Sequence, residues 1–429
     1  MVVRALSQFS FFHPEVAAPA CLAVGTVPWL LARYESTLFP AWTLSGWTGG
    51  DPRGRPAWPA TVLAKLLVLR WSDEGMSRRA SVREADRNIV WRAAMGLEIG
   101  GKTPSEKTVR KFERFLAKRH PEAGVPRYLL LHEHWVRLCL EDGGIIAKAV
   151  WAMDSTPMWC YGAVLDTVRL LGDGVRALAL KWARLTRTKV EALAVSWDLP
   201  LLTAPSTKGA FRVDWHDSEA RATVITEIAT KVLHVVDVIR HRLREVHSGK
   251  RKWFLKRCRH LLKVISNDLE TDEAGNLVVA RRVARDRLIS MTDPHARHGR
   301  KSKSGTFNGF KAHVFGDVVS GLIASVAVTV GNKHDGAVAH RLVRRAKDLC
   351  RHIDLVLADT AYSGAQLRHL LRGATNVDVI APPPPRTALR DGKLGRSDIE
   401  IDFSSNTATC AAGVQTSRST VSWSTDYDA

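Results

Sequence analysis

The pattern of apolar and polar residues changes character several times along the chain. Residues 1–57 mix Pro, Gly and polar positions and predict a loop-rich segment. Across residues 58–140, and again across about 163–290, apolar residues recur at helical spacing. After Ser290 the pattern changes to short apolar runs bounded by turn residues, which predict strands. The sequence therefore predicts two helical regions and one region of mixed α and β structure.

The helix predicted within TPSEKTVRKFERFLAKR is the most distinctive of the first helical region. Thr103 is its expected N-cap, Pro104 its first helical residue, and Glu106 completes a capping box. Its apolar residues share one face, and the opposite face carries four basic side chains: Lys107, Arg110, Lys111 and Arg114. Short helices that end in a basic amphipathic helix are typical of helix-turn-helix DNA-binding domains, and equally of a helical bundle with a solvated basic face.

Two apolar runs end at carboxylates. Residues 145–154 predict a strand that ends at Asp154, and residues 355–358 predict a strand that stops before Asp359. Between them, two alternating runs flank a short turn and predict an antiparallel hairpin. Without the helical segment at 163–290, the order is β-β-β-α-β-α-β, which indicates a mixed α/β fold with functional groups at strand ends.

Asp154 and Asp359 are candidates for chemistry only as a pair, because a single Asp at a strand end is more often a turn or cap residue. If the first and fourth predicted strands are neighbours, the two carboxylates face each other and repel unless a cation lies between them. Mg²⁺ takes oxygen ligands and often binds substrate phosphates at the same time. Such ions can activate water and stabilise the leaving oxygen of a phosphodiester.

The net charge indicates a polyanionic partner. There are 63 Lys and Arg residues against 43 Asp and Glu, a formal charge of +20 that is spread over every region. We expect nucleic acid as the partner; the alternatives are a solvated basic surface or a surface that faces a membrane. The candidate phosphate contacts after the second helical region are Arg297, Arg300, Lys301, Lys303 and Lys311. The alternative for these residues is a solvated loop followed by an ordinary half-exposed strand.

Other classes of site find little support. The six cysteines are far apart and include no CxxC pair, which argues against structural zinc and against a disulfide framework. The N-terminus has no signal-peptide pattern, and the apolar stretch around Trp29 is too short to span a membrane. We therefore expect a cytoplasmic, nucleoid-associated protein with no membrane partner. Asn332, His334 and Asp335 are expected to be turn and helix-cap residues, not ligands.

Several segments, taken in order, resemble one family. AMDSTPM, SMTDPHARHGRKSKSGTFNGFKAHV, VTVGNKHDG and LVLADTAYSG are similar to the successive blocks of bacterial insertion-sequence DDE transposases of the insertion-sequence-five kind. Residues from about 60 to 116 resemble the helical N-terminal domain of the same enzymes. Together the resemblance covers most of residues 55–405.

The resemblance implies a domain organisation and an activity. It implies an all-α, helix-turn-helix-like DNA-binding domain at 58–140, then a ribonuclease H-like catalytic domain at 145–390 that contains the large helical insertion. The implied cofactor is Mg²⁺ (or Mn²⁺), with Asp154 as the first catalytic and metal-binding carboxylate and Asp359 as the second. The implied partners are double-stranded DNA, namely transposon terminal inverted repeats and target DNA, and a second copy of the chain in a homodimer.

The third acid of the family is expected on a helix after the last strand. Glu400 is the single Glu after Asp359, and its segment SDIEIDFSS alternates like a strand. We therefore expect a chain truncated before the third acidic residue, with residues 391–429 as an incomplete, poorly ordered tail. Three functions remain: a transposase that cleaves and joins DNA, a catalytically inactive truncated transposase that only binds DNA, and, with less support, a nuclease of the same fold without strand transfer.

Overall fold

The chain divides into two compact units. The computed structural model describes residues 21–47, 56–73, 75–141, 149–273, 275, 277–301, 305–350, 352–383, 398–402 and 404–417. One unit comprises Met1–Ala149 with Leu349–Arg351, and the other comprises Val150–Asp348 with His352–Ala429. No helix among the described residues is long and apolar enough to cross a membrane.

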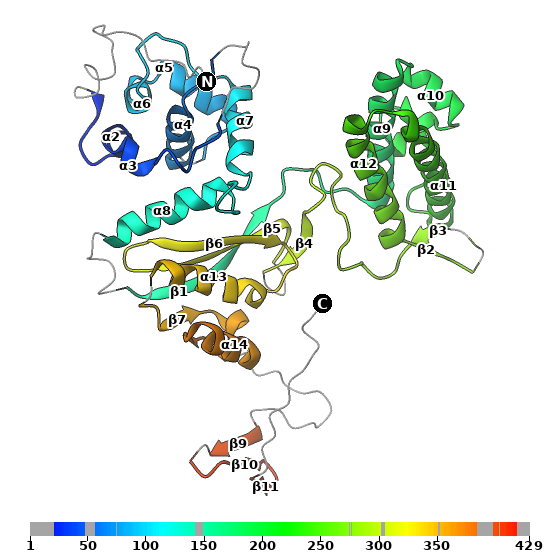
Figure 1. Cartoon of the computed structure of the whole chain (residues 1–429). Helices are drawn as coiled ribbons and strands as arrows, with labels where there is room; N and C mark the ends of the chain where they lie inside the picture. Colours follow the sequence, from blue (N-terminus) through cyan, green and yellow to red (C-terminus); the bar gives the residue numbers. More distant parts are fainter. Residues whose placement is uncertain are drawn as a thin grey trace. The chain divides into compact units, whose positions relative to one another are not determined.

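The first unit is helical (Figure 1). Its helices are α2 (Val27–Arg33), α3 (Glu35–Leu38), α4 (Ala60–Ser72), α5 (Arg78–Arg87), α6 (Ile89–Met95), α7 (Glu106–Leu116) and α8 (Arg127–Glu141). Apolar residues from most of these helices form one buried cluster, to which α4 contributes Leu63 and Leu66 and α7 contributes Phe112. The helical prediction for this region is confirmed.

Helix α7 lies in the unit with its two faces as predicted. Val109, Phe112 and Leu116 are buried, and Glu113 binds Arg70 of α4 at 2.6 Å and Arg78 of α5 at 2.5 Å. These ion pairs fix α7 against two neighbouring helices. The four basic residues on the opposite face are all exposed: Lys107, Arg110, Lys111 and Arg114.

One detail of the helical prediction is wrong, and one boundary was not predicted. The capping residue of α7 is Ser105, whose Oγ accepts from the Thr108 N–H at 3.3 Å, so Thr103 is not the N-cap and Pro104 precedes the helix. Within the predicted helical region 58–140, α5 and α6 are separate helices, because the side chain of Asn88 accepts hydrogen bonds from the backbone N–H groups of Val90 and Trp91 and starts a new helix there.

A mixed sheet forms the centre of the second unit. Its strands are β1 (Trp151–Trp159), β4 (Arg297–Arg300), β5 (Thr306–Asp317), β6 (Ile323–Val330), β7 (Leu355–Ala358) and β8 (Asp378–Ile380). The order is β4-β5-β1-β7-β8, and β6 also pairs with β5. The pairs β1–β5 and β5–β6 are antiparallel, whereas β1–β7 and β7–β8 are parallel.

Helices complete this sheet domain. Helix α13 (Gly336–Leu349) connects β6 to β7, and α14 (Ala365–Thr375) connects β7 to β8 (Figure 1). The predicted hairpin is the β5–β6 pair. Three antiparallel strands followed by two parallel ones, joined by helices, are the ribonuclease H-like arrangement that the resemblance implied, so the predicted fold class is confirmed.

A helical insertion separates β1 from β4. It contains α9 (Thr167–Thr186), α10 (Val190–Ser196), α11 (Ser218–Arg242) and α12 (Ser248–Asp268), the short hairpin β2 (Leu269–Thr271) and β3 (Leu277–Val279), and the 3-10 turns Pro200–Leu202, Lys208–Ala210 and Leu243–Glu245. Six apolar residues at helical spacing along α11 are all buried: Ile225, Ile228, Val232, Val235, Val236 and Ile239. They belong to a core that the insertion helices share.

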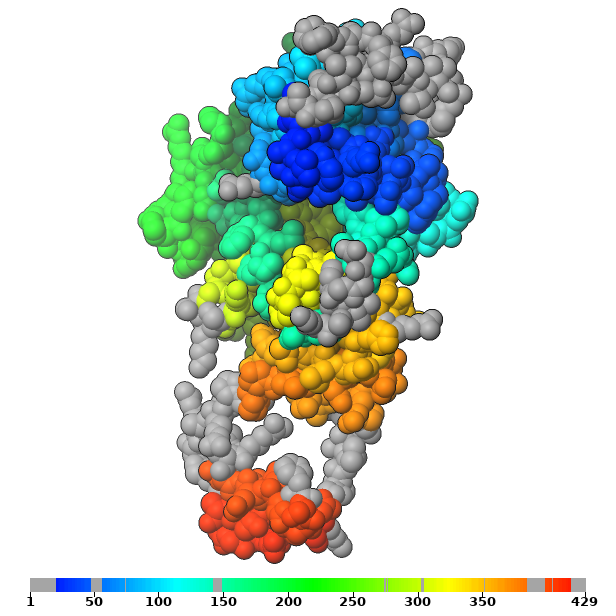
Figure 2. Space-filling view, turned by 90° about the vertical axis from the view of Figure 1, so that its left-hand side faces the viewer, coloured from blue at the N-terminus to red at the C-terminus, as the bar shows by residue number. Residues whose placement is uncertain are grey.

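The C-terminal region contains a small antiparallel sheet. Its strands are β9 (Ile399–Asp402), β10 (Thr407–Cys410) and β11 (Gln415–Thr416), and their side chains form one compact group (Figure 2). The prediction of a poorly ordered tail is wrong for these residues, because the alternation around Glu400 does produce a paired strand. Residues 418–429 lie outside the described residues.

Candidate active site

Asp154 lies within β1, not at its end. The strand continues to Trp159 and pairs with β5 over its whole length, with Asp154 opposite Val314. The predicted end of this strand at Asp154 was wrong. The change from apolar to polar residues marks the point where β1 stops pairing with β7, although β1 itself continues. That pairing joins β1 to β7 and ends at Met153, opposite Ala358. Asp154 is thus the first residue of β1 beyond its pairing with β7.

Asp359 occupies the equivalent position on the neighbouring strand. It directly follows Ala358, so the two acids each come one residue after a paired position on adjacent parallel strands. Both residues are exposed to solvent. Asp359 also caps the 3-10 turn Thr360–Tyr362, since its Oδ1 accepts from the Ala361 N–H at 3.0 Å. The fold therefore holds two accessible carboxylates side by side at one edge of the parallel pairing.

The charges around Asp359 act against its ionised form. Partial burial raises the pKa of Asp359, and the carboxylates of Asp154 and Asp335 raise it further. The Ala361 N–H and the Lys311 ammonium group oppose this shift. A carboxyl group whose ionisation is disfavoured by a neighbouring carboxylate lies in a site that a cation would stabilise.

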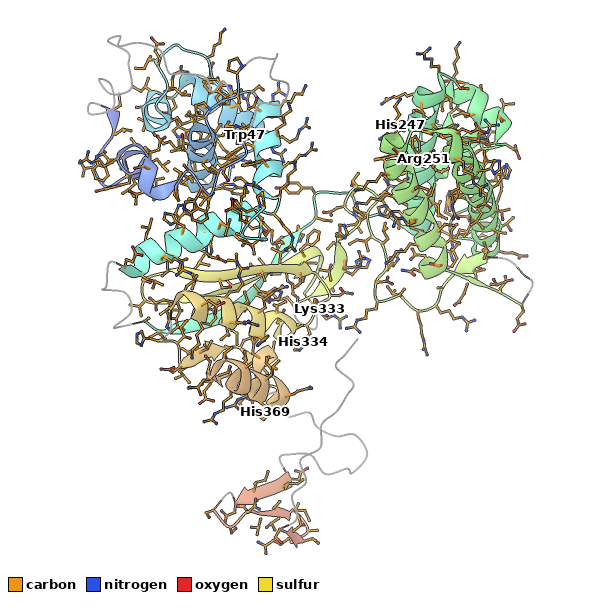
Figure 3. The ribbon with its side chains drawn as sticks, viewed as in Figure 1. Trp47, His247, Arg251, Lys333, His334 and His369 are labelled. Carbon is orange, nitrogen blue, oxygen red and sulfur yellow. The ribbon has the colours of Figure 1, made fainter. Side chains whose placement is uncertain are left out.

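Asp335 is a third acid at this site, and sequence reasoning missed it. Its Oδ1 lies 2.8 Å from the Nζ of Lys311, and both side chains are mostly buried. His334, labelled in Figure 3 beside Lys333 in the loop between β6 and α13, accepts the N–H of Gly336 and is a cap residue as expected. Asp335 lies just before α13, and the expectation that it is not a metal ligand stays a prediction; its ion pair with Lys311 was not expected.

Two aromatic side chains lie buried under the acids. His313 is fully buried, donates to or accepts from Thr329 Oγ1 at 2.8 Å, and has a pKa lowered by burial, so it is neutral and closed to phosphate. Tyr362 is fully buried, and its hydroxyl has no hydrogen-bond partner among the described residues. Burial raises the pKa of Tyr362, and the charge of Asp335 adds to this shift. Tyr362 therefore remains protonated and uncharged.

The basic residues predicted near the site differ in their availability. The segment predicted as a loop is strand β4, which pairs with β5. The guanidinium of Arg297 donates to the backbone carbonyls of Pro294 and Ala296, and burial lowers its pKa. Arg300 and Lys301 are exposed at the end of β4, where their phosphate contact stays a prediction. Lys303 lies outside the described residues, and Lys311 is held by Asp335.

The donor set suits a hard divalent cation. Mg²⁺ commonly binds through one or two carboxylates together with substrate phosphates and water. Asp154 and Asp359 supply two such carboxylates, and their mutual repulsion favours a cation between them. Within the described part of the chain, no group of three or more His, Cys, Asp or Glu side chains is arranged to hold a metal. Glu400 is exposed on β9, where it pairs with Thr409.

Comparison with known families gives two matches. A family model described as "Transposase DDE domain" matches residues 281–421, and one described as "Transposase domain (DUF772)" matches residues 36–114. The chain belongs to the insertion-sequence DDE transposases. No curated protein and no solved structure matches it significantly. Asp359 lies inside the DDE match, whereas Asp154 lies outside both matched segments.

Membership of this family carries general consequences for the transposase. It indicates a function in DNA transposition, DNA as the partner, and dependence on a divalent metal in general. The DUF772 match includes the basic face of α7. The DDE match begins near the end of the insertion and continues through β4 to the C-terminal sheet.

Proposed function

We propose that this transposase cleaves DNA strands at transposon terminal inverted repeats and joins them to target DNA, with Asp154 and Asp359 as the catalytic carboxylates that bind Mg²⁺ or Mn²⁺. The observation that supports the proposal is the shared position of the two acids, one residue after the paired Met153 and Ala358 on adjacent parallel strands. Their exposure supports access by a DNA phosphate. The +20 net charge supports a polyanionic substrate.

The first step hydrolyses a phosphodiester bond to a 5′-phosphate and a 3′-hydroxyl, and the second exchanges one phosphodiester bond for another. In the first step, water forms a bond to a phosphorus atom at the transposon end and releases a 3′-hydroxyl. In the second, that 3′-hydroxyl forms a bond to a target phosphorus atom and releases the target's own 3′-hydroxyl. Bound divalent cations lower the pKa of water and stabilise the charge that develops on the phosphate oxygens.

The side chains around the two acids have supporting roles. The ion pair between Lys311 and Asp335 fixes the loop before α13 beside the site. Buried, uncharged Tyr362 packs within the 3-10 turn that Asp359 caps and so helps to fix the position of Asp359. The exposed basic face of α7 binds the DNA backbone, and a homodimer brings two ends together.

A second function has its own support. The described residues contain no group of three metal-binding side chains. Only Asp154 and Asp359 are proposed to bind metal, because the carboxylate of Asp335 forms an ion pair with Lys311. A site with too few carboxylates would hold its cations weakly. In that case the chain is a catalytically inactive transposase that acts only through DNA binding.

Metal-dependent cleavage of a labelled duplex that carries the element's own ends distinguishes the two functions. We expect cleavage by the unchanged chain and loss of cleavage in Asp359→Asn. The matched control is Asp354→Asn, which makes the same chemical change just before the other end of β7, where the side chain is 80% exposed. Equal cleavage by the unchanged chain and Asp359→Asn would exclude the proposed site, and binding without cleavage would favour the second function.

A further inference from the structure

Helix α12 of the insertion is the most basic helix in the described chain. Seven Lys and Arg residues lie between Ser248 and Lys263, and no acid occurs before Asp268. Lys252, Lys256 and Arg259 are exposed and follow one another at intervals of four and three residues. Such spacing places side chains about 5–6 Å apart on one side of a helix. We call these three residues the α12 basic face.

The positive charge of this face is not neutralised. None of its three residues lies within 4 Å of a carboxylate among the described residues, whereas the next basic residue along the stripe, Lys263, is paired with Asp286. Lys231 of the neighbouring helix α11 is likewise paired, with Glu227 of that helix at 3.0 Å. Lys252 and Lys256 of α12 therefore have no carboxylate partner among the described residues, whereas Lys231 of α11 has one.

Trp253 holds further cations beside this face. The Nζ of Lys181 on α9 lies 4.0 Å from its ring centroid, and the guanidinium carbon of Arg257 lies 5.4 Å from it. Arg257 also donates to the Met291 carbonyl at 2.9 Å. Cation–π contacts fix the direction of such side chains without neutralising them. The cations of α9 and α12 are therefore held in place before any ligand binds.

The local field is positive enough to affect a neighbouring histidine. Burial, with a smaller contribution from the charges of Arg257, Lys256, His295 and Arg259, lowers the pKa of His260 to about 4. Its Nδ1 is buried without a hydrogen-bond partner among the described residues. His260 is therefore neutral and adds no charge to the exposed basic residues of α12. Figure 3 labels Arg251 and His247 near the first turn of the same helix.

We infer that the α12 basic face, with Lys181 and Arg184 of α9, binds the phosphate backbone of duplex DNA. Both α9 residues are exposed, and Lys181 contacts Trp253 directly. Duplex DNA presents regularly spaced phosphates, and it is the polyanion that the family binds. The insertion is therefore a DNA-binding element separate from α7. The inference rests on DNA as the substrate of the proposed function but not on catalysis by the two acids.

The salt dependence of DNA binding tests this inference without any metal. The full chain is compared with the triple variant Lys252→Gln, Lys256→Gln, Arg259→Gln, in EDTA, on one labelled duplex of random sequence. The slope of log K against log salt is negative, and each lost phosphate contact reduces its magnitude by about 0.9. Loss of all three contacts should therefore reduce the magnitude of the slope by about 2.7. Because no metal is present, failure of the catalytic proposal leaves this result unaffected.

Two further variants separate a binding face from bulk charge. Arg212→Gln, Arg221→Gln, Arg242→Gln removes the same charge from exposed positions of the insertion outside α9 and α12, and should leave the slope unchanged. The swap Lys252→Arg, Lys256→Arg, Arg259→Lys keeps the charge and should keep the slope. An unchanged slope in the Gln triple variant would overturn the inference. An equal decrease in the control triple would also overturn it, because only net charge would then matter.

Discussion

The Nζ of Lys311 lies 2.8 Å from Oδ1 of Asp335. Lys311 lies on β5 of the β5–β6 hairpin, and Asp335 follows the end of β6. Their side chains are 12% and 15% exposed, so the pair is largely withdrawn from water. His313 Nδ1 lies 4.0 Å from the same carboxylate oxygen. Because Asp335 also affects the charge state of Asp359, this ion pair connects the hairpin to the proposed catalytic carboxylates.

Breaking this ion pair should destabilise the sheet domain. Asp335→Ala leaves the Lys311 ammonium mostly buried without its partner, and such losses cost about 3 kcal/mol. The double variant Lys311→Met, Asp335→Ala removes both charges and should recover most of that loss. The free energy of unfolding, measured in urea, gives both values. The control pair Arg372 and Asp378 is exposed, and its disruption should cost at most about 1 kcal/mol. Equal losses at both pairs would refute a special role for Lys311.

Asp359→Asn should stabilise the fold at neutral pH. The folded-state pKa of Asp359 is raised, so its ionisation lowers the free energy of unfolding as the pH rises through that value. Below the ordinary Asp pKa of about 3.9, the carboxyl is protonated in both states and the substitution has no charge effect. Urea unfolding of both proteins across this range should show an advantage of the variant that appears only at higher pH. An advantage that does not change with pH would exclude repulsion from Asp154 as its cause.

Divalent metal should stabilise the chain through the same acids. At a Mg²⁺ concentration about 100-fold above its dissociation constant, binding adds about 2.7 kcal/mol to the free energy of unfolding. We expect thermal unfolding of the unchanged chain to shift upward with Mg²⁺ or Mn²⁺, and the shift to disappear in Asp154→Asn and Asp359→Asn. Asp354→Asn should keep the shift, since that carboxylate lies before the opposite end of β7. A shift that survives in the Asp154 variant would locate the metal elsewhere.

The sequence was informative where local patterns decide the structure. Alternating runs with a short turn between them predicted the β5–β6 hairpin, and the apolar spacing of α11 predicted its buried face, because both depend on neighbours in sequence. The Asp154 and Asp359 hypothesis depended on the condition that the first and fourth strands are neighbours, and the sheet meets that condition.

Long-range contacts were beyond the same patterns. The pairing of Lys311 with Asp335 depends on the register of the hairpin and on the path of the chain into α13. Neither can be predicted from the local pattern of apolar residues. The sequence did not predict the extension of β1 past Asp154, because the residues of β1 that pair with β5 beyond Asp154 are polar or exposed and lack an apolar pattern. The break at Asn88 was missed because α5 and α6 continue almost the same helical periodicity.

The exposed face of α7 should supply a second, independent share of DNA affinity. Replacing Lys107, Arg110, Lys111 and Arg114 with Gln keeps good helix formers and leaves the buried face of α7 intact. If each residue contacts one phosphate, the slope of log K against log salt should become shallower by about 3.6. Fluorescence anisotropy with a labelled duplex measures this slope, and exchanging Lys for Arg and Arg for Lys at the same four positions should preserve it. Combined with the α12 triple variant, the two decreases should add, because each face would bind its own phosphates; a combined decrease no larger than that of α7 alone would mean that the helices compete for one segment of DNA.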